Sequence, residues 1–81
     1  MKNVTVYTRT TCAPCRMLKM WLKNKNITFD ELNIDESLEA QKQALKLSGY
    51  SIVPLTVVTR LDGSINVIAG YNLKTLATHL V

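Results

Sequence analysis

Apolar and polar side chains alternate at the start of the chain, which is the period-two pattern of a half-buried strand. The alternation predicts a strand over residues 2–7, broken by the polar run at residues 9–11. From Ala13 to Lys25, apolar side chains recur every three or four positions and the cationic side chains fall on another face. We therefore expect an amphipathic helix over that segment.

A second strand and a second helix are predicted next. The segment Ile27–Ile34 has the composition of a strand, with Phe29 on one face and Leu32 on the other. Capping and acidic residues at 35–37 then introduce a helix that we expect to end at Gly49.

The last third of the chain predicts a hairpin followed by a helix. Residues 55–60 and 65–69 are rich in β-branched side chains, and the turn sequence at 61–64 separates them. After Asn72, a predicted N-cap, apolar residues spaced for one face of a helix extend to Leu80, and we expect His79 to be exposed near the end of this helix. The order is βαβαββα, an α/β fold in which a right-handed βαβ unit and a hairpin form a four-stranded mixed sheet flanked by three helices.

Length and composition restrict the function classes. We expect residues 1–81 to form a single domain, and a content of 47% hydrophobic and 20% charged residues excludes a disordered chain. The longest apolar stretch, residues 52–58, is far shorter than the roughly 20 residues that span a bilayer. No secretory signal follows Lys2, so a cytoplasmic location without membrane association is expected.

The two cysteines, Cys12 and Cys15, form one Cys-x-x-Cys motif between the first strand and the first helix. In a reducing compartment this motif indicates redox catalysis or metal binding, and no nearby His or second Cys pair completes a zinc site. The helix N-terminus favours a thiolate on Cys12, which we assign as the nucleophile. Cys15, one turn inside the helix, is the resolving thiol, and Pro14 fits the first turn because N–H groups there have no intrahelical partner.

Positive charge is concentrated before residue 30. Residues 1–29 hold six Lys and Arg and no acidic residue, whereas residues 30–81 hold four Lys and Arg and six acidic residues. Two of the early cations, Arg9 and Arg16, bracket the cysteines, and we expect them to favour the Cys12 thiolate and to attract acidic partners. Nucleic-acid binding is not expected, because no recognition motif or interleaved aromatic residues accompany the cations; Trp21 and Phe29, with Met17 or Met20 in part, are assigned to the core.

With this motif, the predicted order of elements, and Ile52-Val53-Pro54 before the third strand, the chain resembles the glutaredoxin family within the thioredoxin fold. The resemblance covers nearly all of the chain. It implies a cis peptide bond between Val53 and Pro54 that faces the active-site disulfide. The resemblance and the motif together give these candidate substrate contacts: Arg9, Ala13, Pro14, Val53, Pro54, Gly70, Tyr71 and Asn72.

The chain also departs from the family pattern. Glutaredoxins often carry Tyr where Pro14 stands and paired Asp residues near Asn72, both parts of a glutathione site. Ala69-Gly70-Tyr71 instead resembles the Ser-Gly-Phe of small redoxins that donate electrons to ribonucleotide reductase. The resemblance implies a monomeric dithiol–disulfide oxidoreductase that reduces protein disulfides, ribonucleotide reductase among them. The resemblance further implies that the protein has no bound cofactor or metal. Its electrons are then expected to come from NADPH through thioredoxin reductase, or from glutathione.

The sequence leaves other functions open. One is a glutathione-dependent glutaredoxin acting on mixed disulfides. A copper carrier also places Cys-x-x-Cys between a strand and a helix, but its βαββαβ order differs. Iron–sulfur delivery is disfavoured by the second cysteine and Pro14. On the last helix, we hypothesise that Lys74 and Asn72 receive an acidic group of a partner.

Overall fold

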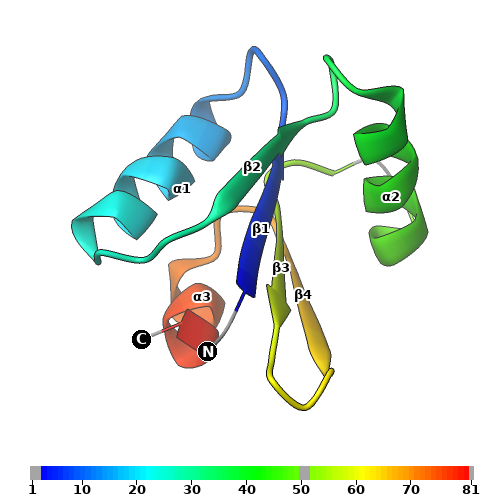
Figure 1. Cartoon of the computed structure of the whole chain (residues 1–81). Coiled ribbons are helices and arrows are strands. Elements are labelled where there is room, and N and C mark those ends of the chain that lie inside the picture. Colours follow the sequence, from blue (N-terminus) through cyan, green and yellow to red (C-terminus); the bar gives the residue numbers. More distant parts are fainter. Residues whose placement is uncertain (1–2, 50–51, 81) are drawn as a thin grey trace.

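The elements follow one another in the predicted order, β1–α1–β2–α2–β3–β4–α3 (Figure 1). The structure is a computed structural model, and it describes residues 3–49 and 52–80. Lys2, at the start of the first predicted strand, lies outside the described residues. The strands are β1 Asn3–Thr8, β2 Asp30–Asn33, β3 Leu55–Thr59 and β4 Ile65–Ala69, and the helices are α1 Ala13–Asn24, α2 Leu38–Ser48 and α3 Leu73–Leu80.

The four strands form one mixed sheet in the order β2-β1-β3-β4. β1 pairs parallel with β2, whereas the β1–β3 and β3–β4 pairs are antiparallel. Helices α1 and α3 cover one face of the sheet and α2 covers the other (Figure 1). The predicted thioredoxin-like architecture is therefore confirmed.

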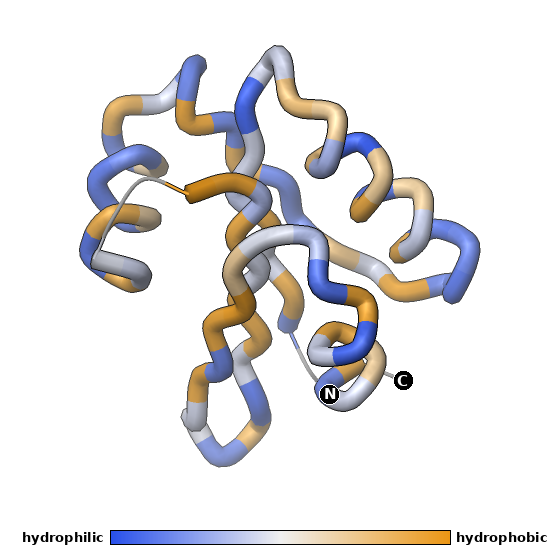
Figure 2. The backbone as a smooth tube through the Cα atoms, turned by 180° about the vertical axis from the view of Figure 1, so that it is seen from behind, coloured by the Kyte–Doolittle hydropathy of each residue, from blue (hydrophilic) through white to orange (hydrophobic). Residues whose placement is uncertain are grey.

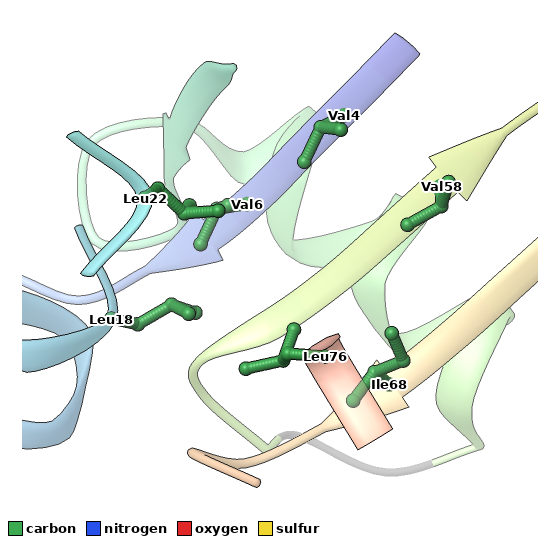
Figure 3. Packing of buried hydrophobic residues seen from close by; sticks show 7 residues of the cluster. All are labelled: Val4, Val6, Leu18, Leu22, Val58, Ile68 and Leu76. Carbon is green, nitrogen blue, oxygen red and sulfur yellow. The ribbon is translucent and has the colours of Figure 1, made fainter. Parts of the chain in front are cut away.

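Each face of the sheet has its own core. The core under α1 and α3 is the larger one, and Figure 3 shows its buried members: Val4, Val6, Leu18, Leu22, Val58, Ile68 and Leu76. The core under α2 contains small helix residues, Ala40 and Ala44, against the sheet residues Tyr7, Leu55 and Val57. Hydrophobic positions accordingly gather along the central strands, while the tip of the β3–β4 hairpin is hydrophilic (Figure 2).

Several sequence predictions need correction. Met17 and Met20 are exposed by 51% and 60%, so neither belongs to the core, whereas Trp21 and Phe29 pack against it as predicted. His79 was expected to be exposed but is half-buried, and its Nδ1 lies 3.2 Å from Nη2 of Arg60.

The bounds of β2 also differ from the prediction, whereas those of α2 agree with it. β2 is shorter than the predicted Ile27–Ile34, because only four residues pair with β1, although Ile27 still packs against the core. α2 begins at Leu38, and Ser37 is its N-cap, accepting a 3.1 Å hydrogen bond from the Ala40 N–H. Its end is as predicted, since Gly49 adopts the left-handed conformation (φ 81°) that favours glycine. No helix in the described part of the chain is long and apolar enough to cross a membrane.

Candidate active site

The Cys-x-x-Cys motif forms the first turn of α1, as predicted. Cys12 is the N-cap, with extended backbone angles, and its Sγ accepts a hydrogen bond from the Cys15 N–H at 3.1 Å. The Cys12 carbonyl accepts the N–H of Arg16 at 3.2 Å, which closes the first helical turn. A sulfur therefore occupies the position where a capping oxygen usually satisfies a first-turn N–H, and a negative charge on that sulfur is favoured there.

The two sulfurs are joined by a disulfide, with a Cα–Cα distance of 5.2 Å. Their exposure differs: Cys12 is 9% exposed and Cys15 only 1%. Ala13 and Pro14, between them, are exposed, and Pro14 lies in the first turn as expected. Access for another disulfide is therefore better at Cys12, which agrees with its assignment as the nucleophile.

Pro54 lies next to the strand that leads into this motif. Tyr7 of β1 pairs with Leu55 of β3, so Pro54 stands beside the end of β1, where the cysteine loop begins. The Val53–Pro54 bond is cis, as predicted, and Pro54 is buried. Half-buried Val53 packs against the α2 core.

The segment before α3 is joined to Pro54. The Gly70 N–H donates to the Pro54 carbonyl at 2.8 Å, and Gly70 has φ 78°, which favours glycine. Tyr71 is half-buried against the core under α1 and α3. Asn72 is exposed and caps α3, because its Oδ1 accepts the Thr75 N–H at 3.2 Å. The Gly70–Pro54 bond thus holds the segment before α3 beside Pro54.

Arg9 has a partner that the sequence interpretation missed. Its Nε donates to Asp35 Oδ1 at 3.1 Å, and the Thr10 N–H donates to Asp35 Oδ2 at 3.0 Å. These bonds hold the pKa of Asp35 below its ordinary value, the Thr10 N–H contributing most and Arg9 next. The Arg9 charge is therefore balanced by a carboxylate, and the loop before Cys12 is fastened to the β2–α2 connection.

A signal for this contact exists in the predicted topology. Parallel neighbours such as β1 and β2 end at the same edge of a sheet, so the residues that follow them meet. Asn33 confirms this meeting, since its Nδ2 donates to Thr10 Oγ1 at 3.2 Å. The contact of Asp35 with Arg9 and Thr10 was not predicted, because Asp35 was assigned to the start of the following helix.

A second set of polar contacts links β1, β2 and α1. The buried Thr8 hydroxyl donates to Glu31 Oε2 at 2.8 Å, and Lys19 Nζ lies 2.9 Å from the same oxygen. Mainly because of the Lys19 bond, the pKa of Glu31 lies below its ordinary value. Lys19 of α1 is thus tied to the edge strand β2.

The structure also bears on metal binding. Within residues 3–49 and 52–80, no group of three or more His, Cys, Asp or Glu side chains is arranged to hold an ion. The chemistry that the described site offers is that of the two sulfurs.

Comparison with known proteins identifies the family. The glutaredoxin family profile matches residues 4–60. The chain belongs to the glutaredoxin family. Within 59 residues it is 41% identical to the glutaredoxin-like protein NrdH of Lactococcus lactis, an alignment that covers 73% of this chain and 78% of that one.

Solved structures agree with this glutaredoxin assignment. The thioredoxin-like protein BC3987 superposes with a TM-score of 0.82 and 28% identity, covering 96% of this chain and 100% of the other. The NrdH-redoxin of Escherichia coli, described as a glutaredoxin-like protein with a thioredoxin-like activity profile, gives a TM-score of 0.75 and 25% identity, covering 94% and 92%. Together with the Cys12–Cys15 disulfide, the family identifies this glutaredoxin as a thiol–disulfide oxidoreductase.

Proposed function

We propose that this glutaredoxin is a cytoplasmic, monomeric electron donor of the NrdH type that reduces disulfides in proteins. The observation that carries the proposal is the arrangement of the two sulfurs: Cys12 is the more accessible and caps the helix, whereas Cys15 is buried one turn inside it. The exposed Ala13-Pro14 backbone beside Cys12 leaves room for a polypeptide substrate.

The reaction has two exchange steps. The Cys12 thiolate attacks one sulfur of the substrate disulfide, forms a mixed disulfide, and releases the other substrate sulfur as a thiolate that takes up a proton. Cys15 then loses its proton and attacks Cys12 Sγ, releasing the second substrate thiol and forming the Cys12–Cys15 disulfide seen here. Two electrons pass from the protein dithiol to the substrate, and a reductant must restore the dithiol.

The substrate contacts belong to the same proposal. Val53, before the cis bond, offers backbone hydrogen bonds to a bound polypeptide. The Gly70 N–H donates to the carbonyl of the next residue, Pro54, and so fixes the backbone there. Ala13, Pro14 and Tyr71 border the site. The Arg9 side chain is held by the Asp35 carboxylate. Arg9 therefore contributes by positioning the loop before Cys12.

Ribonucleotide reductase is the proposed client. The support is the likeness to proteins named NrdH and the Gly70-Tyr71 segment, which leads into α3 beside Pro54. Lys74, exposed in the first turn of α3, supplies a cation for an acidic group of such a partner.

The source of electrons decides between the NrdH type and a glutathione-dependent glutaredoxin. We expect NADPH-coupled turnover with thioredoxin reductase, and much slower turnover with glutathione plus glutathione reductase, because Pro14 and Asn72-Leu73 replace residues of a glutathione site. Faster turnover with glutathione would make the protein a glutathione-dependent glutaredoxin. Activity with neither reductant would contradict the proposed electron-donor function.

A further inference from the structure

Thr56 is a buried residue with an unsatisfied hydroxyl. Its side chain is 0% exposed, and within residues 3–49 and 52–80 its Oγ1 is the buried side-chain oxygen that lacks a hydrogen-bond partner. The other fully buried threonine, Thr8, donates to Glu31. Leaving a buried hydroxyl unpaired is unfavourable, so an orphan of this kind calls for an explanation.

The register of the sheet places Thr56 on the face covered by α1 and α3. Thr56 pairs with Val6 of β1 and with Ile68 of β4, and both of these belong to the core on that face. Cross-strand partners point to the same side of a sheet, so the Thr56 hydroxyl lies in an apolar layer. Leu18 and Leu76, from the two covering helices, are part of that layer (Figure 3).

The buried stripe of α1 leads from the resolving cysteine into this layer. α1 buries Cys15, Leu18 and Leu22 along one stripe, and Leu18 and Leu22 pack in the core that surrounds Thr56. β3 runs in the same direction as α1, because both start at the edge where β1 ends. Cys15 begins the stripe and Thr56 lies two residues after Pro54, so helix and strand geometry put the Thr56 hydroxyl and the Cys15 sulfur at the same end of this core.

In the disulfide form, the Cys15 sulfur is neutral and bonded to Cys12. Such a sulfur is a weak acceptor for a hydrogen bond from a hydroxyl group. The resolving step changes this, since Cys15 must become a thiolate at a position that is 1% exposed. Burial disfavours that charge, and a hydrogen bond to the charged form favours it.

We propose that the Thr56 hydroxyl donates a hydrogen bond to the Cys15 thiolate during the resolving step and thereby speeds closure of the disulfide. The proton of Cys15 leaves with the departing substrate thiol, and Thr56 keeps its own. Thr56 is thus a positioning residue that acts through Cys15 and is unsatisfied in the oxidised state. The inference rests on the proposed roles of Cys12 and Cys15.

A coloured leaving group separates the two exchange steps. Reduced protein is mixed with an aromatic disulfide whose released thiolate absorbs visible light, so attack by Cys12 gives a first phase and closure by Cys15 a second. We expect Thr56→Val to leave the first phase unchanged and to slow the second about tenfold at neutral pH, because a hydrogen bond to a charged group contributes at least that factor. The loss should shrink as the pH rises and Cys15 ionises without help.

Matched variants separate the hydroxyl from packing. Thr56→Ser and Thr56→Ala remove the same methyl group, so only the alanine variant should slow the second phase, and this pair serves also if Thr56→Val does not fold. Thr59→Val, on the opposite face of β3, should change neither phase. Equal second phases in the serine and alanine variants would overturn the role of Thr56, whereas loss of the first phase in the unaltered protein would overturn the proposed function itself.

Discussion

Cys12 and Cys15 are three residues apart in sequence but lie in different surroundings. Cys12 caps the helix and receives the Cys15 N–H, whereas Cys15 is enclosed by the core. Both positions were predicted from the place of the motif between a strand and a helix, since helix geometry alone puts the first sulfur at the N-cap and the second one turn on. Their chemical difference follows from this single local feature.

Replacing each sulfur should give different products. Cys12→Ser should abolish disulfide reduction, because the remaining thiol is buried. Cys15→Ser should retain the first attack and accumulate the mixed disulfide, since the resolving thiolate is missing. Mass spectrometry after mixing with substrate measures the adduct. Comparable adduct on both variants would contradict the assigned order of attack.

Asp35 is the residue of the site that the sequence did not reveal. Its role depends on contacts with Arg9 and Thr10, which lie about 25 residues earlier in the chain, so no local pattern contains it. Thr56 was missed for a similar reason: a β-branched residue in a strand is ordinary, and only the packed structure shows that its hydroxyl has no partner.

The Asp35 contact should stabilise the protein in a pH-dependent way. The folded-state pKa of Asp35 is lowered, so its contribution is present above its unfolded pKa of about 3.9 and is lost as the pH falls through the lower folded value. Asp35→Asn should therefore reduce stability at pH 7 and have little effect at the acid end of the folded range.

Urea unfolding of the Asp35→Asn variant at both pH values measures this difference. Glu36→Gln, at the exposed neighbouring acid, is the matched control and should behave like the unaltered protein at both. A difference between Asp35→Asn and the unaltered protein that persisted at low pH would show that charge on Asp35 is not the cause.

At the scale of the elements, the sequence predicted the number, type and order of helices and strands, but not every boundary. Period-two and helical patterns are properties of a segment, so they located the centre of each element. The limits depend on neighbours: β2 extends only as far as β1 pairs with it, and α2 starts after Asp35 has turned toward Thr10. Met17 and Met20 were misassigned because they flank the buried stripe of α1 without belonging to it.

Lys74 provides a test of the start of α3. A cation in the first turn opposes the helix dipole, so Lys74→Glu should raise stability by about 0.3–1 kcal/mol, measured by urea unfolding. The same change should slow turnover with an acidic partner protein, because it replaces attraction by repulsion. Stability and activity would then move in opposite directions, which excludes unfolding as the cause.

Lys74→Gln is the intermediate control and should lie between the two in both measurements. Unchanged turnover of Lys74→Glu with every reductant and client would show that the start of α3 does not receive an acidic group.

At the scale of the whole molecule, the fold redistributes the charge imbalance of the sequence. The cation-rich first 29 residues meet acids from the later part: Arg9 pairs with Asp35 and Lys19 with Glu31. The sequence prediction that both Arg9 and Arg16 surround the cysteines with positive charge therefore needs refinement. Arg16 follows Cys15 and is exposed, and it has no salt bridge within the described residues, so it is the cation beside the disulfide that acts at longer range.

This difference predicts how salt affects the encounter with an acidic client. Attraction between charged surfaces weakens as ionic strength rises, and the slope of that decrease reflects the charge near the docking site. Arg16→Gln should slow association with an acidic client several-fold at low salt and flatten its salt dependence. Arg9→Gln should have a smaller effect, because the Asp35 carboxylate already offsets that charge.

Stopped-flow association rates from low to moderate salt measure both slopes. Lys46→Gln, on α2 across the sheet from the disulfide, removes the same charge at a distance and should leave the slope nearly unchanged. If all three variants gave the same slope, net charge alone would govern the encounter and the position of Arg16 would be irrelevant. A steeper loss for Arg9→Gln than for Arg16→Gln would mean that the Arg9–Asp35 pair opens when a partner approaches, so that Arg9 rather than Arg16 guides the client to Cys12.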